Sequence, residues 1–263
     1  MGRIQEALKK AEESRARNAT GAAGSGRDGA AAALGTGSAT SFALSAALRD
    51  SEVDPHVIAL LDPQSPIAEE YRTLRANLQS LSSQEPLKVF VVTSAVPNEG
   101  KSLTCMNLAC ILAEDTAKRV VVVDADLRRP TVHKLLGIDN QRGIADYLGG
   151  GTMLEMVIQR SRVANLWALP SGRVPPNPAE LLGSKRMDDL MARLRRDYDY
   201  VVIDAPPFVS TTDAGCVAPR ADGTILVVRM ERTPKEVSRH AVELLKKVKA
   251  TVVGTVLTGL END

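Results

Sequence analysis

The chain has 263 residues, of which 44% are hydrophobic and 25% charged, and its 33 basic and 32 acidic residues leave a formal net charge of +1. This composition is typical of a folded protein with a sizeable core, and the balanced charge excludes a general nucleic-acid binder. The longest wholly apolar runs, such as Val120–Val123, are too short to span a membrane, and the N-terminus lacks the apolar core of a signal peptide. We therefore expect a soluble cytoplasmic protein that has no nucleic acid among its partners.

Two N-terminal segments differ from the rest of the chain. Residues 1–17 predict a charged helix with a thin apolar stripe through Ile4, Leu8 and Ala11. Such a stripe suits either a solvated helix or a helix that docks on a partner. Residues 18–50 consist mainly of Ala, Gly, Ser and Thr, a composition typical of a flexible linker. Both segments precede the expected nucleotide-binding domain, residues 51–263.

Within this domain, apolar β-branched runs alternate with helical patterns. Strands are predicted at Lys88–Thr93, Arg119–Asp124, Leu166–Leu169, Tyr200–Asp204, Thr224–Val228 and Val252–Leu257. Helices are predicted at Ile67–Leu81, Ser102–Asp115, Thr152–Arg160, Ser184–Asp197 and Pro234–Lys249. Continuous Val/Ile runs are typical of strands buried on both faces of a parallel sheet. The alternation therefore predicts a three-layer, doubly wound, mostly parallel α/β fold like that of the phosphate-loop (P-loop) nucleotide hydrolases.

The segment from Ser94 to Ser102, S-A-V-P-N-E-G-K-S, lies between a predicted strand and a predicted helix. In that context a Gly-Lys-Ser sequence binds the phosphates of a nucleotide, because backbone N–H groups and the helix N-terminus face the anion. Lys101 would reach the β- and γ-phosphate oxygens, and the hydroxyl of Ser102 would complete a Mg²⁺ shell. Ala95 stands where the standard pattern has its first glycine, and an ordinary turn with a surface lysine is the alternative. We expect nucleotide contacts from Pro97, Asn98, Glu99, Gly100, Lys101, Ser102 and Leu103.

Acidic residues follow two further predicted strands at their carboxyl ends. Asp124 and Asp126 belong to D-A-D-L-R-R-P, and Asp204 belongs to I-D-A-P-P. Because a buried carboxylate needs a cation or hydrogen-bond donors, a magnesium–phosphate cluster explains all three. We expect Asp124 and Asp204 to hold Mg²⁺ together with Ser102, Asp204 through water, and Asp124 and Asp126 to accept the proton of an attacking hydroxyl. A helix cap, or a loop carboxylate paired with Arg128, is the alternative for Asp124.

These motifs together resemble the cytoplasmic bacterial tyrosine kinases of capsular and exopolysaccharide systems, the CpsD/CapB type. The D-x-D-x-R-R-P segment at residues 124–130 is the most specific match, and I-D-x-P-P at 203–207 and L-P-S-G at 169–172 accompany it. The resemblance covers about residues 53–260. It implies a kinase that transfers the γ-phosphoryl group of Mg-ATP to tyrosine, with Lys101, Asp124 and Asp126 as its catalytic residues.

The resemblance extends to the helix before the phosphate loop. Glu69, Arg72 and Arg75 match the family's E-x-x-R-x-x-R oligomerisation motif, and their spacing of three places them along one helix face. The resemblance implies a homo-oligomer in which this face contacts the next subunit, and an intrahelical salt bridge is the alternative. It also implies a membrane-embedded partner of the polysaccharide co-polymerase kind, which would hold the kinase at the inner face of the cell membrane.

Two features depart from the family pattern. No tyrosine follows Tyr200, so autophosphorylation of a tyrosine-rich tail is not expected, and Thr258 stands where the family's closing strand has an asparagine. Two other functions therefore compete with the kinase. One is a nucleotide-binding regulatory scaffold without transfer chemistry, and the other is a switch ATPase of the MinD/ParA kind. Val96 weighs against the second, because it occupies the position of an additional lysine in those ATPases.

Overall fold

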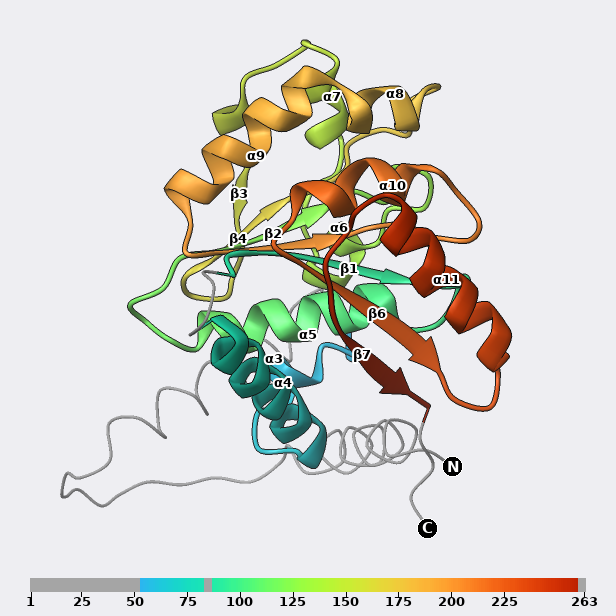
Figure 1. Cartoon of the computed structure of the whole chain (residues 1–263). Coiled ribbons are helices and arrows are strands. Elements are labelled where there is room, and N and C mark those ends of the chain that lie inside the picture. The colour runs from blue at the N-terminus through green and yellow to red at the C-terminus, as the bar shows by residue number, and fades with distance from the viewer. Residues whose placement is uncertain (1–52, 83–86, 260–263) are drawn as a thin grey trace, which may run out of the picture.

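The computed structural model describes residues 53–82 and 87–259, and the expected N-terminal helix (1–17) and linker (18–50) lie outside these residues. Figure 1 shows helices and strands alternating along the chain. The helices are α3 (Ile58–Leu61), α4 (Pro66–Ser82), α5 (Lys101–Ala113), α6 (Val132–Leu136), α7 (Ile144–Leu148), α8 (Pro178–Gly183), α9 (Lys185–Asp197), α10 (Asp213–Val217) and α11 (Lys235–Lys247), with short 3-10 turns η1 (Leu154–Met156) and η2 (Ala218–Arg220). The strands are β1 (Val89–Ser94), β2 (Val120–Asp124), β3 (Gln159–Arg160), β4 (Leu166–Leu169), β5 (Tyr200–Asp204), β6 (Gly223–Arg229) and β7 (Val252–Thr258). Across these described ranges, no helix combines the length and the apolar character needed to cross a membrane.

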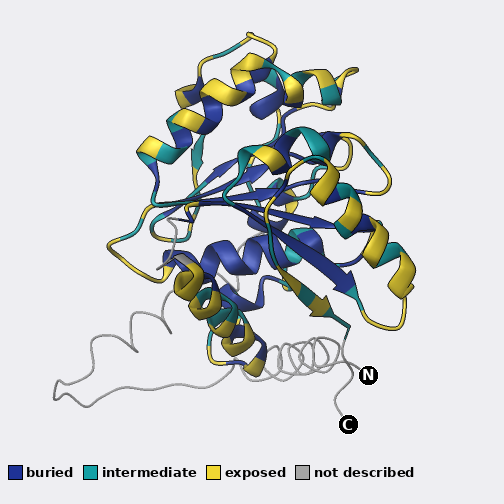
Figure 2. Cartoon of the chain, viewed as in Figure 1, coloured by how far each residue is buried: buried dark blue, intermediate teal, exposed yellow. Residues whose placement is uncertain are grey.

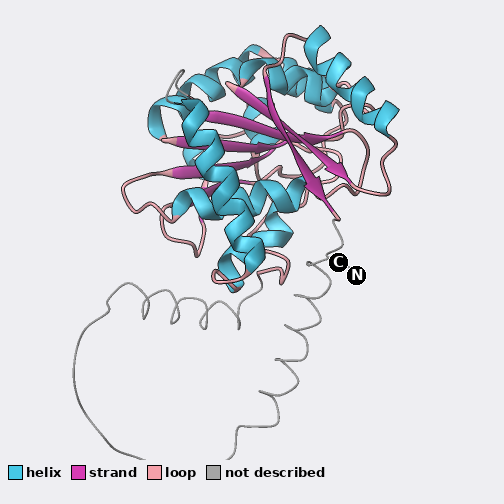
Figure 3. Cartoon of the chain, turned by 60° about the horizontal axis from the view of Figure 1, so that its bottom comes forward, coloured by secondary structure: helices cyan, strands magenta, loops and turns pink. Residues whose placement is uncertain are grey.

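The strands form one sheet in the order β3-β4-β2-β5-β1-β6-β7. Every neighbouring pair is parallel except β3 with β4, which is antiparallel. Figure 3 shows the twisted sheet with helices packed on both of its faces. The predicted three-layer, doubly wound, mostly parallel α/β fold is therefore confirmed.

The central strands are buried on both faces because their side chains alternate between two cores. In β1, Val89 and Val91 pack into the core under α7 to α11, whereas Phe90 and Val92 pack into the core under α3 to α6. Figure 2 shows the central strands as buried, while the edge strand β7 is partly exposed. Burial on both sides is what an uninterrupted run of valines such as Val120–Val123 requires.

The helices follow the amphipathic pattern expected of the outer layers. Met187, Leu190, Met191 and Leu194 of α9 are buried and recur at helical spacing, while charged residues occupy the opposite face. Helix α5 is different, because almost all of its residues are buried between the sheet and α4. This central helix begins at the phosphate loop, so the loop is fixed to the most buried helix of the fold.

One predicted element is wrong. The helix expected at Thr152–Arg160 is instead the turn η1 followed by the edge strand β3. Leu154 and Val157 are both buried and three residues apart, which imitates one face of a helix. Gln159 and Arg160 instead pair antiparallel with Ala168 and Trp167 of β4, across the short segment 161–165, and the spacing of the apolar residues does not reveal this pairing.

Candidate active site

The candidate site lies at the carboxyl edge of the sheet, where β1, β2 and β5 end side by side. Asp124 at the end of β2 stands in register with Asp204 at the end of β5, and Asp204 is also in register with Val92 of β1. The phosphate loop leaves β1 at this edge and enters α5. Ligands of doubly wound sheets bind at this edge, so the fold gathers the predicted residues where a nucleotide would bind.

The phosphate loop has the backbone conformation of an anion-binding turn. Asn98 and Gly100 both have positive φ angles, of 67° and 91°, and Gly100 directly precedes α5. A left-handed backbone at Gly100 favours glycine over any residue with a side chain. Lys101, Ser102 and Leu103 form the first turn of α5, where backbone N–H groups have no acceptor within the helix. These amides are therefore placed as the predicted binding of an anion requires.

The structure explains why Ala95 replaces the first glycine of the standard pattern. Ala95 does not have a positive φ angle and is fully buried. Its carbonyl accepts a hydrogen bond from Val209 N–H at 3.2 Å, and the carbonyl of Ser94 accepts one from Phe208 N–H at 2.7 Å. This position therefore extends strand-like pairing beyond β1 and needs no glycine.

Glu99 lies in the loop as predicted, but its carboxylate faces the protein. The residue is 2% exposed. Its carboxylate accepts hydrogen bonds from Val96 N–H at 2.7 Å, from Arg229 N–H at 3.2 Å and from the Thr233 hydroxyl. The Thr258 hydroxyl donates to the Glu99 backbone carbonyl at 2.7 Å. Glu99 and Thr258 thus brace the phosphate loop against the ends of β6 and β7.

Lys101 lies at the centre of a buried charge cluster. Its ammonium is 2.9 Å from the Asp126 carboxylate, 3.2 Å from Asp204 and 3.1 Å from the Ser102 hydroxyl. Asp124 and Asp204 are fully buried, and Asp126 is 3% exposed. The structure therefore brings together Lys101, Ser102 and all three predicted carboxylates, which lie far apart in the sequence.

The electrostatics of this cluster are dominated by burial and by an excess of negative charge. Burial and the nearby Asp204 raise the pKa of Asp124 to about 8. Burial also raises the pKa of Asp204, although Lys101 counteracts this. Burial opposes the charge of Lys101, but Asp204 and Asp126 outweigh it and raise the lysine's pKa. Three carboxylates thus share one ammonium, and a further positive charge would be stabilised at this cluster.

Asp124 also shapes the loop that follows β2. One of its oxygens accepts a hydrogen bond from Asp126 N–H at 3.2 Å, and the other accepts bonds from Thr131 N–H at 2.9 Å and Val132 N–H at 3.0 Å. These bonds curl the loop so that the Asp126 side chain meets the ammonium of Lys101. Asp124 therefore holds the loop after β2 in shape in addition to any role toward a ligand.

Of the two alternatives for Asp124, the helix cap is present, because Asp124 accepts the N–H groups of Thr131 and Val132 at the start of α6, whereas Arg128 does not pair with Asp124. Arg128 instead forms a bidentate ion pair with Asp213, with distances of 2.6 Å from Nε and 3.1 Å from Nη2 to the two carboxylate oxygens. Asp213 is fully buried at the start of α10. The pair connects the loop after β2 to the loop after β5. Sequence reasoning missed Asp213, because nothing in its neighbourhood indicates a partner 85 residues away.

The predicted oligomerisation residues lie apart from this cluster, on α4. Arg72 pairs with Glu69 at 3.1 Å and with Glu114 at 2.7 Å, and Arg75 pairs with Glu114 at 3.1 Å. Arg75 also donates to the carbonyl of Ile111 at 2.7 Å. The intrahelical salt bridge is therefore present, and Glu114, directly after α5, joins both arginines to the far end of the helix that begins at Lys101.

Comparisons with known proteins agree with this geometry. The site and fold define a P-loop nucleotide-binding domain, and a family model described as "AAA domain" matches residues 88–255. The chain is 39% identical to the tyrosine-protein kinase YwqD of Bacillus subtilis over 211 residues, which is 80% of this chain and 89% of that protein. The kinase domain of the Escherichia coli tyrosine kinase ETK superposes with a TM-score of 0.77 at 29% identity, over 81% of this chain and 82% of that one.

The chain therefore belongs to the bacterial tyrosine-protein kinases, as its motifs predicted, and the expected enzyme class is confirmed by this membership. Some relatives are much longer: the match to the tyrosine-protein kinase wzc of Salmonella typhimurium, 35% identical, covers 74% of this chain but 26% of that protein. MinD of Pyrococcus horikoshii shares the fold, with a TM-score of 0.56 at 23% identity over 65% of this chain and 69% of that one. The MinD-like alternative gains no support beyond this shared fold. The fold and the family together imply that the chain binds ATP.

Proposed function

We propose that the chain transfers the γ-phosphoryl group of Mg-ATP to tyrosine side chains of proteins. The observation that carries the proposal is the position of Lys101, whose ammonium lies between Asp126 and Asp204 at the opening of α5. An ammonium there can neutralise transferring phosphate oxygens, while carboxylates beside it serve a metal ion and a proton. Family membership supports the same conclusion.

The donor set fits Mg²⁺. Three buried carboxylates face one ammonium, and the raised pKa of Asp124, about 8, reflects its burial and the nearby charge of Asp204. Mg²⁺ prefers carboxylate, hydroxyl and phosphate oxygens. We assign Ser102, Asp124 and Asp204 to the ion, with Asp204 acting through water. The bound ion would supply charge neutralisation at the β- and γ-phosphate oxygens.

The chain's own residues would bind the phosphates and accept a proton. Lys101 and the backbone amides from Gly100 to Leu103 bind phosphate oxygens at the start of α5. Pro97 and Asn98 are exposed and flank the nucleotide from the loop. Both oxygens of Asp124 accept backbone hydrogen bonds, whereas Asp126 accepts one from Arg129 N–H and contacts the Lys101 ammonium with its other oxygen. Asp126 is the better proton acceptor of the two in this proposal, because an ammonium that turned to the phosphates would release that oxygen.

The acceptor tyrosine belongs to another polypeptide in this proposal. All four tyrosines of the chain are buried or half-buried, and burial raises the pKa of both Tyr71 and Tyr198. A homo-oligomer assembled through Glu69, Arg72 and Arg75 would bring neighbouring subunits together. Arg72→Ala would then shift the oligomer toward monomer in analytical ultracentrifugation without changing ATP binding.

Family resemblance supports a cellular role in capsule or exopolysaccharide assembly. We place the chain in the cytoplasm, at the inner face of the membrane, held there by a membrane-embedded co-polymerase or activator protein. Co-purification of the chain with such a partner from solubilised membranes tests this placement. Recovery of the chain only from the soluble fraction, with the partner expressed, would contradict it.

Phosphotransfer itself is tested with labelled ATP, Mg²⁺ and a tyrosine-containing acceptor protein, comparing the wild type with Lys101→Met. The wild type should produce phosphotyrosine, and the variant should lose at least about a hundredfold in rate because the ammonium stabilises charge developing in transfer. Nucleotide binding is measured separately by calorimetry. A wild type that binds ATP but forms no phosphotyrosine would identify a regulatory scaffold instead.

A further inference from the structure

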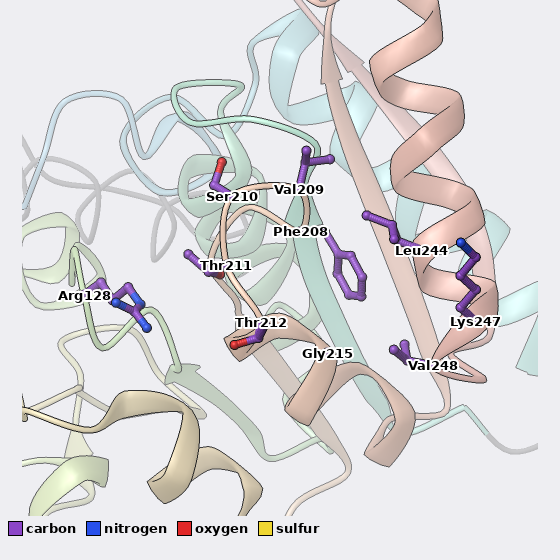
Figure 4. A pocket seen from close by; sticks show the side chains of 10 residues that line it. All are labelled: Arg128, Phe208, Val209, Ser210, Thr211, Thr212, Gly215, Leu244, Lys247 and Val248. Atoms are coloured by element: carbon purple, nitrogen blue, oxygen red, sulfur yellow. The ribbon is translucent and has the colours of Figure 1, made fainter.

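A pocket of about 650 Å³ opens beside the candidate active site. It lies between the loop that follows β5, the first turns of α10 and the last turns of α11 (Figure 4). The ring of Phe208 points toward Leu244 of α11 and Val248 directly after it, and Arg128 lies on the far side of the loop formed by residues 208–212. A volume of this size accommodates a drug-sized molecule or a few residues of a peptide.

The lining of the pocket is linked to the predicted catalytic residues through two neighbouring segments of the chain. Phe208 and Val209 donate backbone hydrogen bonds to the first residues of the phosphate loop, at 2.7 and 3.2 Å. Arg128 lies two residues after Asp126, whose carboxylate contacts the ammonium of Lys101. A polypeptide in the pocket would therefore lie against Arg128 of the loop that carries Asp126, and against the segment that is hydrogen-bonded to the start of the phosphate loop.

The lining combines an apolar floor with positive charge at its rim. Phe208, Leu244 and Val248 provide the apolar surface, and Arg128 and Lys247 are the charged lining residues. None of the lining residues, all of which belong to the described part of the chain, is acidic. Arg128 is already paired through Nε and Nη2 with the buried Asp213, so Lys247 supplies the lining charge that has no ion-pair partner among the described residues.

Gly215 keeps the pocket open. A Cβ atom at this position would lie 3.7 Å from a methyl group of Val248 and 3.8 Å from the ring of Phe208, which is ordinary van der Waals contact. Alanine therefore fits, whereas a longer apolar side chain would project into the same space and fill it. Substitutions of increasing size at position 215 would therefore fill the pocket to an increasing extent.

We propose that this pocket docks an acidic segment of the protein acceptor, with a bulky apolar side chain seated against Phe208 and carboxylates facing Lys247 and Arg128. The inference rests on the proposed kinase function and specifies its substrate class. Charge complementarity selects the acidic segment, because the rim is basic and the lining has no carboxylate. The apolar floor selects a segment in which a large hydrophobic or aromatic residue accompanies the acidic ones.

The test uses a fluorescently labelled copolymer of glutamate and tyrosine as the probe, with binding measured by anisotropy on the full chain. Lys247→Glu should weaken binding about threefold to tenfold, because it removes one attraction and adds a repulsion at an exposed site. Lys246→Glu is the matched control, since Lys246 is equally exposed on the same helix turn but does not line the pocket. Its affinity should stay within about twofold of the wild type.

Gly215→Leu provides an independent arm. It should weaken copolymer binding at least about tenfold by filling the apolar seat, while Gly215→Ala binds like the wild type. Polyglutamate without tyrosine should bind the wild type more weakly than the copolymer. Equal losses in Lys246→Glu and Lys247→Glu, unchanged binding in a folded Gly215→Leu, or equal binding of polyglutamate would each overturn the proposal.

Failure of the docking inference is distinguishable from failure of the kinase proposal. Phosphorylation of the copolymer by the wild type and by Lys247→Glu with the same KM would refute docking at this pocket and leave the kinase intact. Binding of the copolymer that is lost in Lys247→Glu, without phosphotyrosine in any variant, would support docking and refute phosphotransfer. ATP affinity should be the same in all four variants, because neither lysine nor Gly215 belongs to the phosphate loop.

Discussion

The Glu99 brace gives a sharp prediction, because the variant Glu99→Gln keeps the shape of the side chain and changes only its charge and one acceptor. The carboxylate accepts Val96 N–H on one oxygen and Arg229 N–H together with the Thr233 hydroxyl on the other. An amide side chain has only one oxygen. Whichever way it turns, its NH₂ group must face a backbone N–H that is already a donor.

Glu99→Gln therefore loses at least one buried hydrogen bond and the charge assistance of the others. A buried donor left without an acceptor costs about 1–3 kcal/mol, so the free energy of unfolding should fall by about 2 kcal/mol. Urea denaturation followed by circular dichroism measures this. Glu236→Gln, an exposed residue in the first turn of α11, is the control and should change stability by less than about 0.5 kcal/mol.

A double-mutant cycle with Thr233→Val isolates the brace from general effects of the substitution. Thr233→Val removes one of the three donors and should cost about 1 kcal/mol alone, but less when Glu99 is already glutamine. Additive effects would mean that the two side chains do not interact. A stability of Glu99→Gln within about 0.5 kcal/mol of the wild type would refute the brace altogether.

Three further outcomes are expected. Asp213→Asn should lower the rate of phosphotransfer several-fold with little change in ATP affinity, because Arg128 loses the ionic partner that holds its loop. Steady-state kinetics measure this rate, and the control is Asp188→Asn, which breaks the exposed ion pair with Arg220. The metal-free protein should lose stability as the pH rises from about 6 to about 8, with a slope of at most about 1.4 kcal/mol per pH unit. Glu114→Gln should cost less than about 1 kcal/mol in urea denaturation, because its ion pairs are partly exposed.

The sign of the pH effect follows from the raised pKa of Asp124, about 8, which arises from burial and from Asp204. The folded state holds a proton that the unfolded carboxylate releases above about pH 4, so stability falls as pH rises through the interval up to about 8. Asp124→Asn should flatten this slope in thermal melts. An unchanged slope in Asp124→Asn would contradict the assignment of the pH effect to Asp124. Separately, equal phosphotransfer rates in Asp213→Asn and Asp188→Asn would contradict the role given to the Arg128–Asp213 pair.

Much of the site was predictable because its information is local. Uninterrupted Val/Ile runs identify buried parallel strands, and the residues just after them, such as Asp124 and Asp204, must meet at one sheet edge. The Gly-Lys-Ser sequence that follows β1 predicts where α5 begins. These inferences need only chain order and the handedness of parallel crossovers.

The remainder depends on contacts between distant parts of the chain. From the sequence, Asp124 is the nearby partner considered for Arg128. In the structure Arg128 instead pairs with Asp213, which is 85 residues away. Glu114 meets Arg72 across 42 residues, and a single sequence does not show such pairings. The side-chain direction of Glu99 was also not predictable. Its position in the phosphate loop follows from the sequence, but its side chain turns toward residues at and after the end of β6, which come much later in the chain.

The alanine at the first position of the phosphate loop has a consequence for how such chains are recognised. A search pattern that demands glycine there passes over this protein, although its backbone at Gly100 and Lys101 has the required form. Ala95 continues the pairing of β1 with the chain after β5, and any small residue with an extended backbone meets that need. A pattern based on backbone conformation, which requires glycine only where φ is positive, describes this loop better than a pattern based on residue identity.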